Sequence, residues 1–376
     1  MKEFLKNTDW HLLLFFLFIP FLSLIVLYSA GYNENTNIKI LNWLPFTIKS
    51  EAFFKQLINI TLAFFALILG YFINLKKLQK FSFFLYLLMV CFLIAVLIIG
   101  ITSKGSQRWI PLGFFRFQPS EFSKCVIIII IAYFIAKVPP KPEGYDLKSL
   151  IVPLILILIP TILILIQPDL GTALSVFAIS FSMLLFAGIR KKILIMFVIF
   201  AIILSIPAWN FILKPYQQKR VLTLFNPEAD PLGTGYHIIQ SKIAVGSGGI
   251  TGKGFRQGTQ TQLEFLPENT TDFIFSVLSE EWGFLGSGFV LFCYFVFISS
   301  LIKLAKKCRD PFYVMIVFGF ASYLTFHLFV NIGMVIGIMP VVGLPLPLFS
   351  YGGSALLMVF FIQGLILNIS YSRKRI

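Results

Sequence analysis

The chain has 376 residues, of which 58% are hydrophobic and only 12% are charged, and its mean hydropathy is +0.89. An average soluble chain carries about 25% charged residues, so this composition excludes a cytosolic enzyme, a disordered protein and a disulfide scaffold. It is typical of a polytopic membrane protein. The formal charge of +15 would suggest nucleic-acid binding in a soluble protein, whereas in a membrane protein it first has to be compared with the topology.

Ten stretches of the chain are apolar and long enough to cross a membrane, which takes about 20 residues. They predict spans over residues 11–30, 54–73, 81–100, 120–137, 149–166, 169–187, 192–213, 284–304, 312–337 and 346–370. We therefore expect an all-α polytopic integral membrane protein with a single ten-helix domain over residues 1–376. One long extracytoplasmic loop, residues 214–283, separates the seventh and eighth helices.

The basic residues give the orientation, because Lys and Arg are concentrated in the cytoplasmic loops of membrane proteins. With the N-terminus inside, 18 of the 31 basic residues fall in six short cytoplasmic segments. An even number of spans returns the C-terminus to the cytoplasm. Most of the net charge is thus explained by topology, and we expect no nucleic-acid partner. The four cysteines and three histidines form no CxxC pair or Cys/His cluster, so neither a disulfide nor a zinc site is predicted.

Charged residues interrupt the apolar pattern in the short outer segment 101–119 and in the fourth helix. The segment carries three basic residues and no acidic one, which leaves two interpretations open: contact with lipid headgroups, or a site for phosphate or pyrophosphate. Glu121 and Lys124 share one face of the helix because they are three residues apart. Ionisable groups within a membrane span are costly, so Glu121 and Lys124 form either a structural ion pair or the lining of a polar cavity.

Two aspartates stand where an apolar stretch begins. Asp169 follows Pro168, and we interpret its carboxylate as the cap of the sixth helix. Asp272 lies where the long polar segment returns to the apolar bundle. It is either another helix cap, or a partly desolvated carboxylate suited to act as a general base.

The long segment 214–283 is rich in Gly, Gln, Thr and charge, and loops of this length are usually functional or disordered. Residues 232–244 show the spacing of an amphipathic helix, which predicts partial order at the membrane surface. The run SGGITGKG (247–254) superficially resembles a phosphate-binding P-loop. It lacks the first required Gly and the Ser or Thr that holds magnesium, so we reject that interpretation.

Four motifs in order resemble those of the SEDS family (shape, elongation, division and sporulation). NIGMVIGIMPVVGLPLPLFSYGGSA (331–355) resembles the C-terminal signature of the family, and QRWIPLGFFRFQPSEFSK (107–124), QPDLGTA (167–173) and FLPENTTDFIFSVLSEEWGFLG (265–286) are similar to three further blocks. The stretch from 240 to 268 resembles the rod-shape-determining RodA-type branch. The signature positions filled here are Asn331, Pro340, Gly343, Ser350, Gly352 and Gly353.

This resemblance implies an inverting peptidoglycan glycosyltransferase that polymerises lipid II into glycan strands during cell elongation. The enzyme would be multi-pass in the bacterial cytoplasmic (inner) membrane, with its active site facing outward. Its partners would be lipid II, the undecaprenyl-pyrophosphate-linked glycan, a class B penicillin-binding protein that crosslinks the strands, and other membrane proteins of the elongation complex. The resemblance implies no certain cofactor, but a divalent cation, Mg²⁺ or Mn²⁺, could bind at the pyrophosphate.

Carried over position by position, the resemblance makes Asp272 the catalytic residue. The Glu and Lys that the family has in the fourth helix correspond to Glu121 and Lys124. Arg108 and Gln118 match further positions of the RWIPLG…QPSE block. Glycosyl transfer to a sugar hydroxyl needs a base, which Asp272 offers, and cations for the departing lipid pyrophosphate. Arg108, Lys124 and Arg220 offer those cations. The ENT before TD (268–270) departs from many relatives but leaves Asp272 intact.

Two other functions use the same residues. A lipid II flippase would also need a basic groove, yet it should show polar residues continuing to the cytoplasmic side or inverted repeats. A non-catalytic scaffold that activates the penicillin-binding protein would need neither Asp272 at the loop edge nor Lys124 within the membrane.

Overall fold

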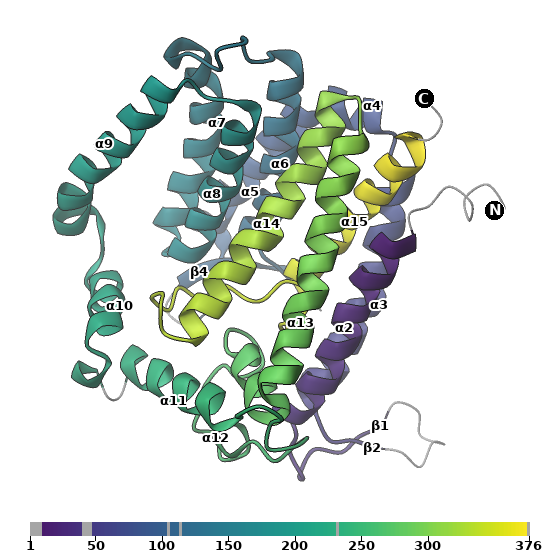
Figure 1. The fold of residues 1–376 in the computed structure, drawn as a ribbon, viewed down its shortest axis with the longest axis vertical. Coiled ribbons are helices and arrows are strands. Elements are labelled where there is room, and N and C mark those ends of the chain that lie inside the picture. The colour runs from purple at the N-terminus through teal and green to yellow at the C-terminus, as the bar shows by residue number, and fades with distance from the viewer. Residues whose placement is uncertain (1–9, 40–46, 104–105, 113–114, 231–232, 374–376) are drawn as a thin grey trace. The chain divides into compact units, whose positions relative to one another are not determined.

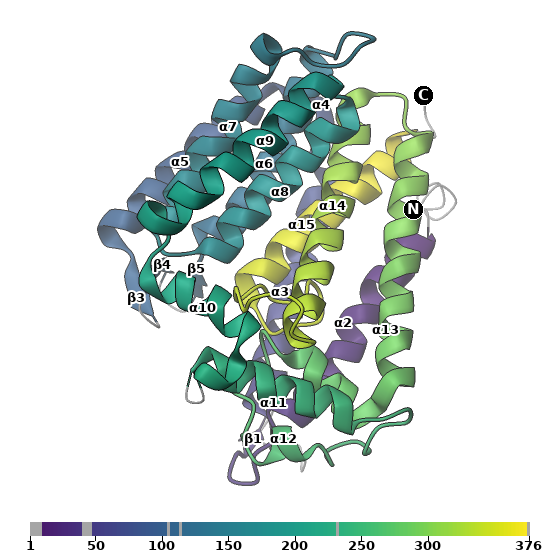
Figure 2. The ribbon, with the colours of Figure 1, turned by 60° about the vertical axis from the view of Figure 1, so that its left-hand side comes forward.

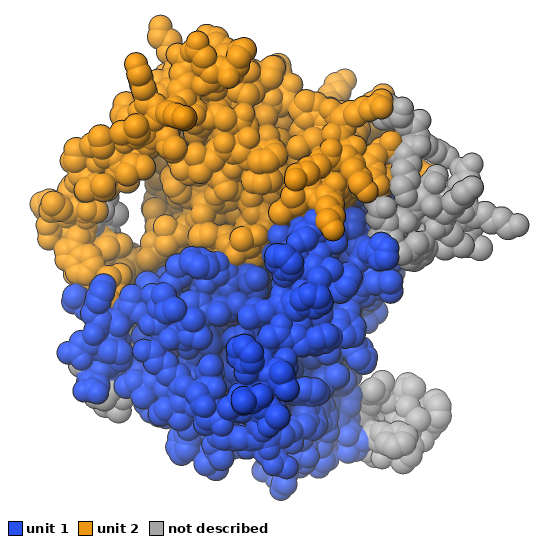
Figure 3. Space-filling view, viewed as in Figure 1, with its two compact units in different colours: residues 1–71, 222–300, 327–367 blue, residues 72–221, 301–326, 368–376 orange. Residues whose placement is uncertain are grey.

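The structure is a computed structural model that describes residues 10–39, 47–103, 106–112, 115–230 and 233–373. Lys104 of the basic outer segment, Leu232 at the start of the expected amphipathic helix, and both chain ends lie outside these residues. The described chain divides into two compact units, coloured separately in Figure 3. Unit 1 comprises residues 1–71, 222–300 and 327–367, and unit 2 comprises residues 72–221, 301–326 and 368–376.

Ten helices among the described residues are long and apolar enough to cross a membrane, which confirms the predicted number of spans (Figure 1). They are α2 (Trp10–Ala30), α3 (Glu51–Phe72), α5 (Ser82–Ile99), α6 (Pro119–Lys137), α7 (Leu147–Ile166), α8 (Leu170–Ala187), α9 (Lys191–Pro207), α13 (Ile274–Lys307), α14 (Pro311–Val335) and α15 (Gly353–Arg373). The shorter helices are α4 (Leu75–Lys80), α10 (Pro215–Phe225), α11 (Thr234–Ser247) and α12 (Thr259–Gln262), with a π-helical turn at Ala208–Ile212 and a 3-10 turn at Pro227–Ala229.

Two predicted helix starts differ from the structure. Helix α13 begins at Ile274, ten residues before the predicted start of the eighth span at 284, but its backbone is non-helical at Gly283, so the predicted start falls at this break. The tenth begins at Gly353 rather than at 346. Pro345 and Pro347 stand on either side of the predicted start, and proline cannot continue the hydrogen-bond ladder of a helix.

In unit 1, α3 and α15 approach closely at two glycines. A Cβ at Gly70 would overlap the carbonyl oxygen of Phe361, and a Cβ at Gly364 would overlap that of Leu67. Small residues let membrane helices pack backbone to backbone in this way. Phe16 of α2 packs edge-on against Phe360 of α15, with ring centroids 4.6 Å apart.

In unit 2, α6 is the central helix, and α5, α7 and α8 all pack on it. In the most apolar stretch of α6, 78% of the residues are buried, whereas in that of the span that contains α9, 0% are buried. Gly319 of α14 also meets α6, since a Cβ there would lie 2.7 Å from the side chain of Ile128. The ion pair of α6 is therefore surrounded by protein.

The segment after α5 is folded as a small antiparallel sheet, which the sequence did not predict. Its strands are β3 (Ile101–Ser103), β4 (Ser106–Leu112) and β5 (Phe115–Phe117), in the order β3-β4-β5. Ile101 pairs with Trp109, and Ile110 pairs with Phe117. A second, two-stranded ladder joins β1 (Ile38–Lys39) to β2 (Thr47–Ile48).

The predicted amphipathic helix is present as α11. The buried hydroxyl of Ser241 donates to the carbonyl oxygen of Val335 (2.6 Å) and lies 2.8 Å from the hydroxyl of Ser276. These contacts join α11 to both α13 and α14. Figures 1 and 2 both draw α11 and α12 beside the start of α13.

Candidate active site

Asp272 lies in a tight turn immediately before α13. Glu268 begins the turn with a φ of +54°, and its carbonyl oxygen accepts from the backbone N–H groups of Thr271 (3.1 Å) and Phe273 (3.2 Å). Helix α13 then starts at Ile274. The carboxylate is half-buried, so Asp272 stands at the edge of the span, as the sequence predicted.

The C-terminal signature holds the backbone of this turn at three successive carbonyls. Tyr351 N–H donates to Thr270 O (2.9 Å), the Ser350 hydroxyl donates to Thr271 O (2.6 Å), and the Asn331 side-chain amide donates to Asp272 O (2.9 Å). Buried carbonyl groups need such partners. The signature quoted from the sequence therefore has a structural role, which is to fix the segment that carries Asp272.

Gly343, also in the signature, lies directly beside the carboxylate. Its φ is +74°, and a Cβ at this position would be 3.5 Å from Oδ2 of Asp272. Glycine adopts this left-handed conformation without steric cost, which explains why a glycine occupies this position.

Sequence reasoning missed Gln56, a buried amide in α3 that supports the signature from the other side. Its Nε2 donates to Ser350 O (3.2 Å), and its Oε1 accepts from Gly352 N–H (3.4 Å). A fully buried glutamine within an apolar helix is the kind of signal that marks a functional neighbourhood in a membrane protein.

Arg108 projects from β4 to the turn between α7 and α8. Its Nη2 donates to the carbonyl oxygen of Pro168, and its Nη1 lies 3.7 Å from Oδ1 of Asp169. Asp169 also caps α8 as predicted, because Oδ1 accepts from Thr172 N–H (3.2 Å). Arg108 Nε and Asp169 Oδ2 are both buried without a hydrogen-bond partner among the described residues. The predicted helix cap and the predicted cation are thus one cluster.

Arg220 reaches the same cluster through an aromatic ring. The guanidinium carbon of Arg220 lies 5.8 Å from the ring centroid of Tyr216 in α10, within the range of cation–π contacts. The Tyr216 hydroxyl donates to Pro168 O at 3.5 Å. The structure therefore brings Arg108 and the Tyr216 hydroxyl to one carbonyl group and places Arg220 against the ring of the same tyrosine.

Glu121 and Lys124 form a buried ion pair in the first turns of α6. Lys124 Nζ donates to Glu121 Oε1 at 2.7 Å, and the two side chains are 3% and 7% exposed. The ammonium also lies 5.4 Å from the ring centroid of Tyr323. Gln118 stands at the N-cap of this helix, and its Nε2 donates to the Ser120 hydroxyl (3.1 Å) rather than capping it.

Of the predicted site residues, Asp272 belongs to unit 1, and Arg108, Gln118, Glu121, Lys124 and Arg220 belong to unit 2. Among the described residues, no group of three or more His, Cys, Asp or Glu side chains is arranged to hold a metal ion.

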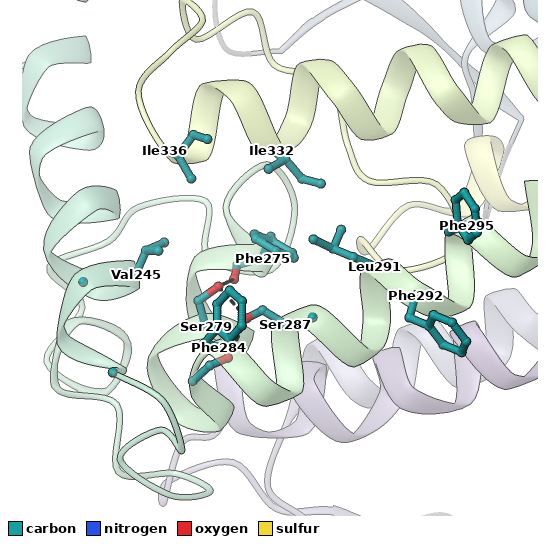
Figure 4. Close-up of a pocket in the computed structure, with 14 residues that line it drawn as sticks. Val245, Phe275, Ser279, Phe284, Ser287, Leu291, Phe292, Phe295, Ile332 and Ile336 are labelled. Atoms are coloured by element: carbon teal, nitrogen blue, oxygen red, sulfur yellow. Dashed lines mark hydrogen bonds between the residues drawn. The ribbon is translucent and has the colours of Figure 1, made fainter.

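Unit 1 also has an apolar pocket of about 640 Å³ between α11, α13 and α14. Figure 4 shows the aromatic side chains of Phe275, Phe284 and Phe292 around it, with the hydrogen bond between Ser279 and Ser287 (2.9 Å) among them. None of the predicted site residues lines this pocket.

Comparison with known proteins identifies the family. A family model described as "Cell cycle protein" (FtsW, RodA and SpoVE) matches residues 9–375. The peptidoglycan glycosyltransferase MrdB of Escherichia coli strain K12 is 44% identical over 291 residues, which cover 77% of this chain and 78% of MrdB. The MrdB of Helicobacter pylori strain J99 is 37% identical over 319 residues, covering 84% and 82% of the two chains.

Solved structures agree. A chain of a peptidoglycan synthase complex, described as coordinating polymerization and crosslinking, matches with a TM-score of 0.79 and 32% identity over 98% of this chain and 99% of that chain. The rod shape determining protein RodA of Thermus thermophilus matches with a TM-score of 0.70 and 26% identity over 97% of each chain. This chain is therefore a multi-pass membrane protein that belongs to the SEDS family, with the FtsW, RodA and SpoVE proteins.

Proposed function

We propose that this protein is a RodA-type peptidoglycan glycosyltransferase, which polymerises lipid II into glycan strands. The relatives named as such enzymes support the activity. The observation that carries the assignment of its centre is the set of three hydrogen bonds by which the C-terminal signature holds carbonyls 270, 271 and 272. A rigidly held backbone is what a catalytic side chain requires.

In this reaction Asp272 acts as the general base. Its carboxylate takes the proton of a sugar hydroxyl on one lipid II as the hydroxyl oxygen forms a bond to the anomeric carbon of the growing chain. The bond between that carbon and the pyrophosphate oxygen breaks, and the lipid pyrophosphate leaves with the electron pair. A single displacement inverts the anomeric centre, in contrast to the two-step retaining hydrolases.

The cations of unit 2 bind the pyrophosphate. Arg108 uses two of its nitrogens on Pro168 and Asp169, which fixes the guanidinium plane and leaves the unpartnered Nε–H for an anion oxygen. Arg220 adds a second guanidinium, which lies against the ring of Tyr216, whose hydroxyl donates to the same carbonyl group. Lys124, paired with Glu121 and away from water, stabilises charge that develops on the leaving group. Gln118 contributes an amide at the start of the same helix.

We further propose the setting of the reaction. The enzyme lies in the bacterial inner membrane with its active site outward, and it acts with a class B penicillin-binding protein and other membrane proteins of the elongation complex. The match to a complex described as coordinating polymerization and crosslinking supports the penicillin-binding partner. A divalent cation, Mg²⁺ or Mn²⁺, bound with the pyrophosphate would supply further charge neutralisation to the leaving group.

The test is polymerisation of lipid II by the purified protein with its penicillin-binding partner in detergent. We expect the wild type to make glycan polymer and Asp272→Asn, which keeps the shape of the side chain but not its basicity, to make none. Glu264→Gln is the matched control, because it removes an exposed carboxylate from the same outer segment. A folded wild type without polymer would favour a flippase or a scaffold, and polymer from Asp272→Asn would remove Asp272 as the base.

A further inference from the structure

Helix α13 is broken at Gly283. This residue has a φ of +64° and a ψ of −161° within an otherwise helical run, a backbone conformation that is essentially restricted to glycine. A Cβ here would overlap the backbone nitrogen of Gly252. The break divides α13 into a short first part, which follows directly from the Asp272 turn, and a long second part.

The glycine-rich segment 249–254 fills this break with its own backbone. Lys253 and Gly254 donate their N–H groups to the carbonyl oxygens of Glu280 and Glu281, each at 3.0 Å. In return, Phe284 donates to Gly249 O (2.9 Å) and Leu285 donates to Ile250 O (3.0 Å). These four helix groups would otherwise pair with one another, 284 with 280 and 285 with 281, in a continuous α-helix.

Glycines allow this segment and the backbone of α13 to lie close together. A Cβ at Gly248 would overlap the carbonyl oxygen of Ser279, and a Cβ at Gly252 would overlap that of Glu281. The glycine run that superficially resembled a P-loop is therefore an insert that replaces two hydrogen-bonded positions of a membrane helix.

An ion pair between Lys253 and the buried Glu280 holds the insert on the helix. The side chain of Glu280 is fully buried, and its Oε1 accepts from Lys253 Nζ at 2.7 Å. Lys253 thus binds Glu280 twice, through its backbone N–H and through its ammonium group. Gly258 lies against the same carboxylate, since a Cβ there would be 2.8 Å from Oε2.

The same carboxylate oxygen closes the chain segment that carries Asp272. Glu280 Oε1 also accepts from the hydroxyl of Thr259 and from the backbone N–H of Gln260, each at 3.1 Å, and so caps α12. Gln260 and Glu280 are 20 residues apart, and Asp272 lies between them. One buried side chain therefore holds both ends of the segment 260–280.

We propose that Lys253 and Glu280 are positioning residues for the reaction: their ion pair keeps the glycine-rich segment in the break of α13 and thereby sets the place of Asp272. This inference rests on the proposed function. When the pair is lost, segment 249–254 leaves, α13 closes its own hydrogen bonds across Gly283, and the first part of the helix shifts together with the Asp272 turn.

The test compares Lys253→Met, Glu280→Gln and the double variant in the full-length protein with its penicillin-binding partner. We expect kcat for lipid II polymerisation to fall by about 10- to 100-fold, KM to stay within about twofold, and the double variant to be no worse than the poorer single variant. Lys253→Arg keeps the cation and should retain at least about half of the wild-type activity. If a lone buried charge prevents one single variant from folding, the double variant, which removes both charges, still measures the effect of losing the pair.

Amide hydrogen exchange gives a direct readout. In the double variant, which leaves no lone buried charge, peptides covering 249–254 and 260–273 should exchange faster while the thermal midpoint of the folded protein stays close to that of the wild type. Glu51→Gln is the control, because it removes an exposed ion pair with Lys55 in the same unit and should change neither quantity.

Each outcome separates this inference from the proposed function. A wild type that polymerises lipid II, with Lys253→Met and Glu280→Gln both at full kcat, would overturn the positioning role and leave Asp272 in place. Activity that falls only in parallel with the folded fraction, without rescue by Lys253→Arg, would also overturn it. A wild type without polymer would instead contradict the proposed function.

Discussion

The side-chain amide of Asn331 donates one hydrogen bond to the backbone carbonyl of Asp272 (2.9 Å) and a second to that of Leu344 (2.8 Å). Asn331 is fully buried in the last turns of α14. It therefore fixes the turn that carries the proposed base and, at the same time, the non-helical segment that follows α14. Asn331 thus links two of the four motifs that resemble those of the family, 265–286 and 331–355.

Replacing Asn331 with Leu should harm activity more than stability alone explains. The change leaves the carbonyl groups of Asp272 and Leu344 buried without a partner, which costs about 1–3 kcal/mol each. We expect a loss of about 2–6 kcal/mol in the free energy of unfolding, measured by denaturation in detergent, and almost no polymer from the protein that remains folded. Asn368→Leu is the control. It removes a similar bond, to Ile73 O (2.6 Å), and should keep its specific activity.

Gly283→Ala should abolish the break in α13. The new Cβ overlaps the inserted segment, and alanine does not tolerate this backbone conformation. We expect the variant to fold with a more continuous helix and to lose most of its polymerisation activity. Gly288→Ala is a matched control in the same helix, because a Cβ there meets nothing within 4 Å. It should be neutral or stabilising by about 1 kcal/mol, and equal effects of the two changes on activity would contradict the role of the break.

The Glu121–Lys124 pair can be assigned by comparing single and double variants. Lys124→Met leaves a buried carboxylate without its cation and should cost about 3–5 kcal/mol. The double variant Glu121→Gln/Lys124→Met removes both charges and should regain most of that stability. If Lys124 acts on the leaving group, the double variant stays inactive in the polymerisation assay. Activity that returns together with the thermal midpoint would make the pair purely structural.

Arg108→Lys should weaken binding of the pyrophosphate-linked substrate. A single ammonium group cannot reach Pro168 O and Asp169 and also present a fixed third donor, as the planar guanidinium does. We expect KM for lipid II to rise by roughly tenfold with a smaller change in kcat. Arg116→Lys, at an exposed position in β5 of the same sheet, should leave KM unchanged. A KM unchanged in both variants would remove Arg108 from the anion site.

The number of spans was predictable because each helix is a nearly continuous apolar run. A helix surface that faces lipid needs the same apolar side chains as one that faces other helices. The start of α13 was not predictable. Glu280 and Glu281 look like residues of an outer loop in the sequence, yet both are buried, one bonded to Lys253 and the other to the Ser29 hydroxyl. Hydropathy measures the side chain alone and cannot include a partner that lies far away in the chain.

The site shows the same limit. Residue type and place made Asp272, Arg108 and Lys124 candidates, since charge next to an apolar stretch is costly, and the family resemblance supplied the roles predicted for them. The contact of Arg108 with Asp169, the support of Ser350 by Gln56, and the insertion of 249–254 into α13 all join residues from separate elements. None of them leaves a local pattern, because the backbone groups involved are the same in every residue.

The hydrogen bond between Thr271 and Ser350 has a consequence for synthesis of the protein on the ribosome. These residues are 79 positions apart, so the Asp272 turn is translated well before Ser350 exists. At a translation rate of about 5–20 residues per second, this interval is roughly 4–16 s. During that time the carbonyls of the turn have no signature to bind. A nascent chain already inserted in the membrane therefore lacks the hydrogen bond that holds this turn until Ser350 has been made.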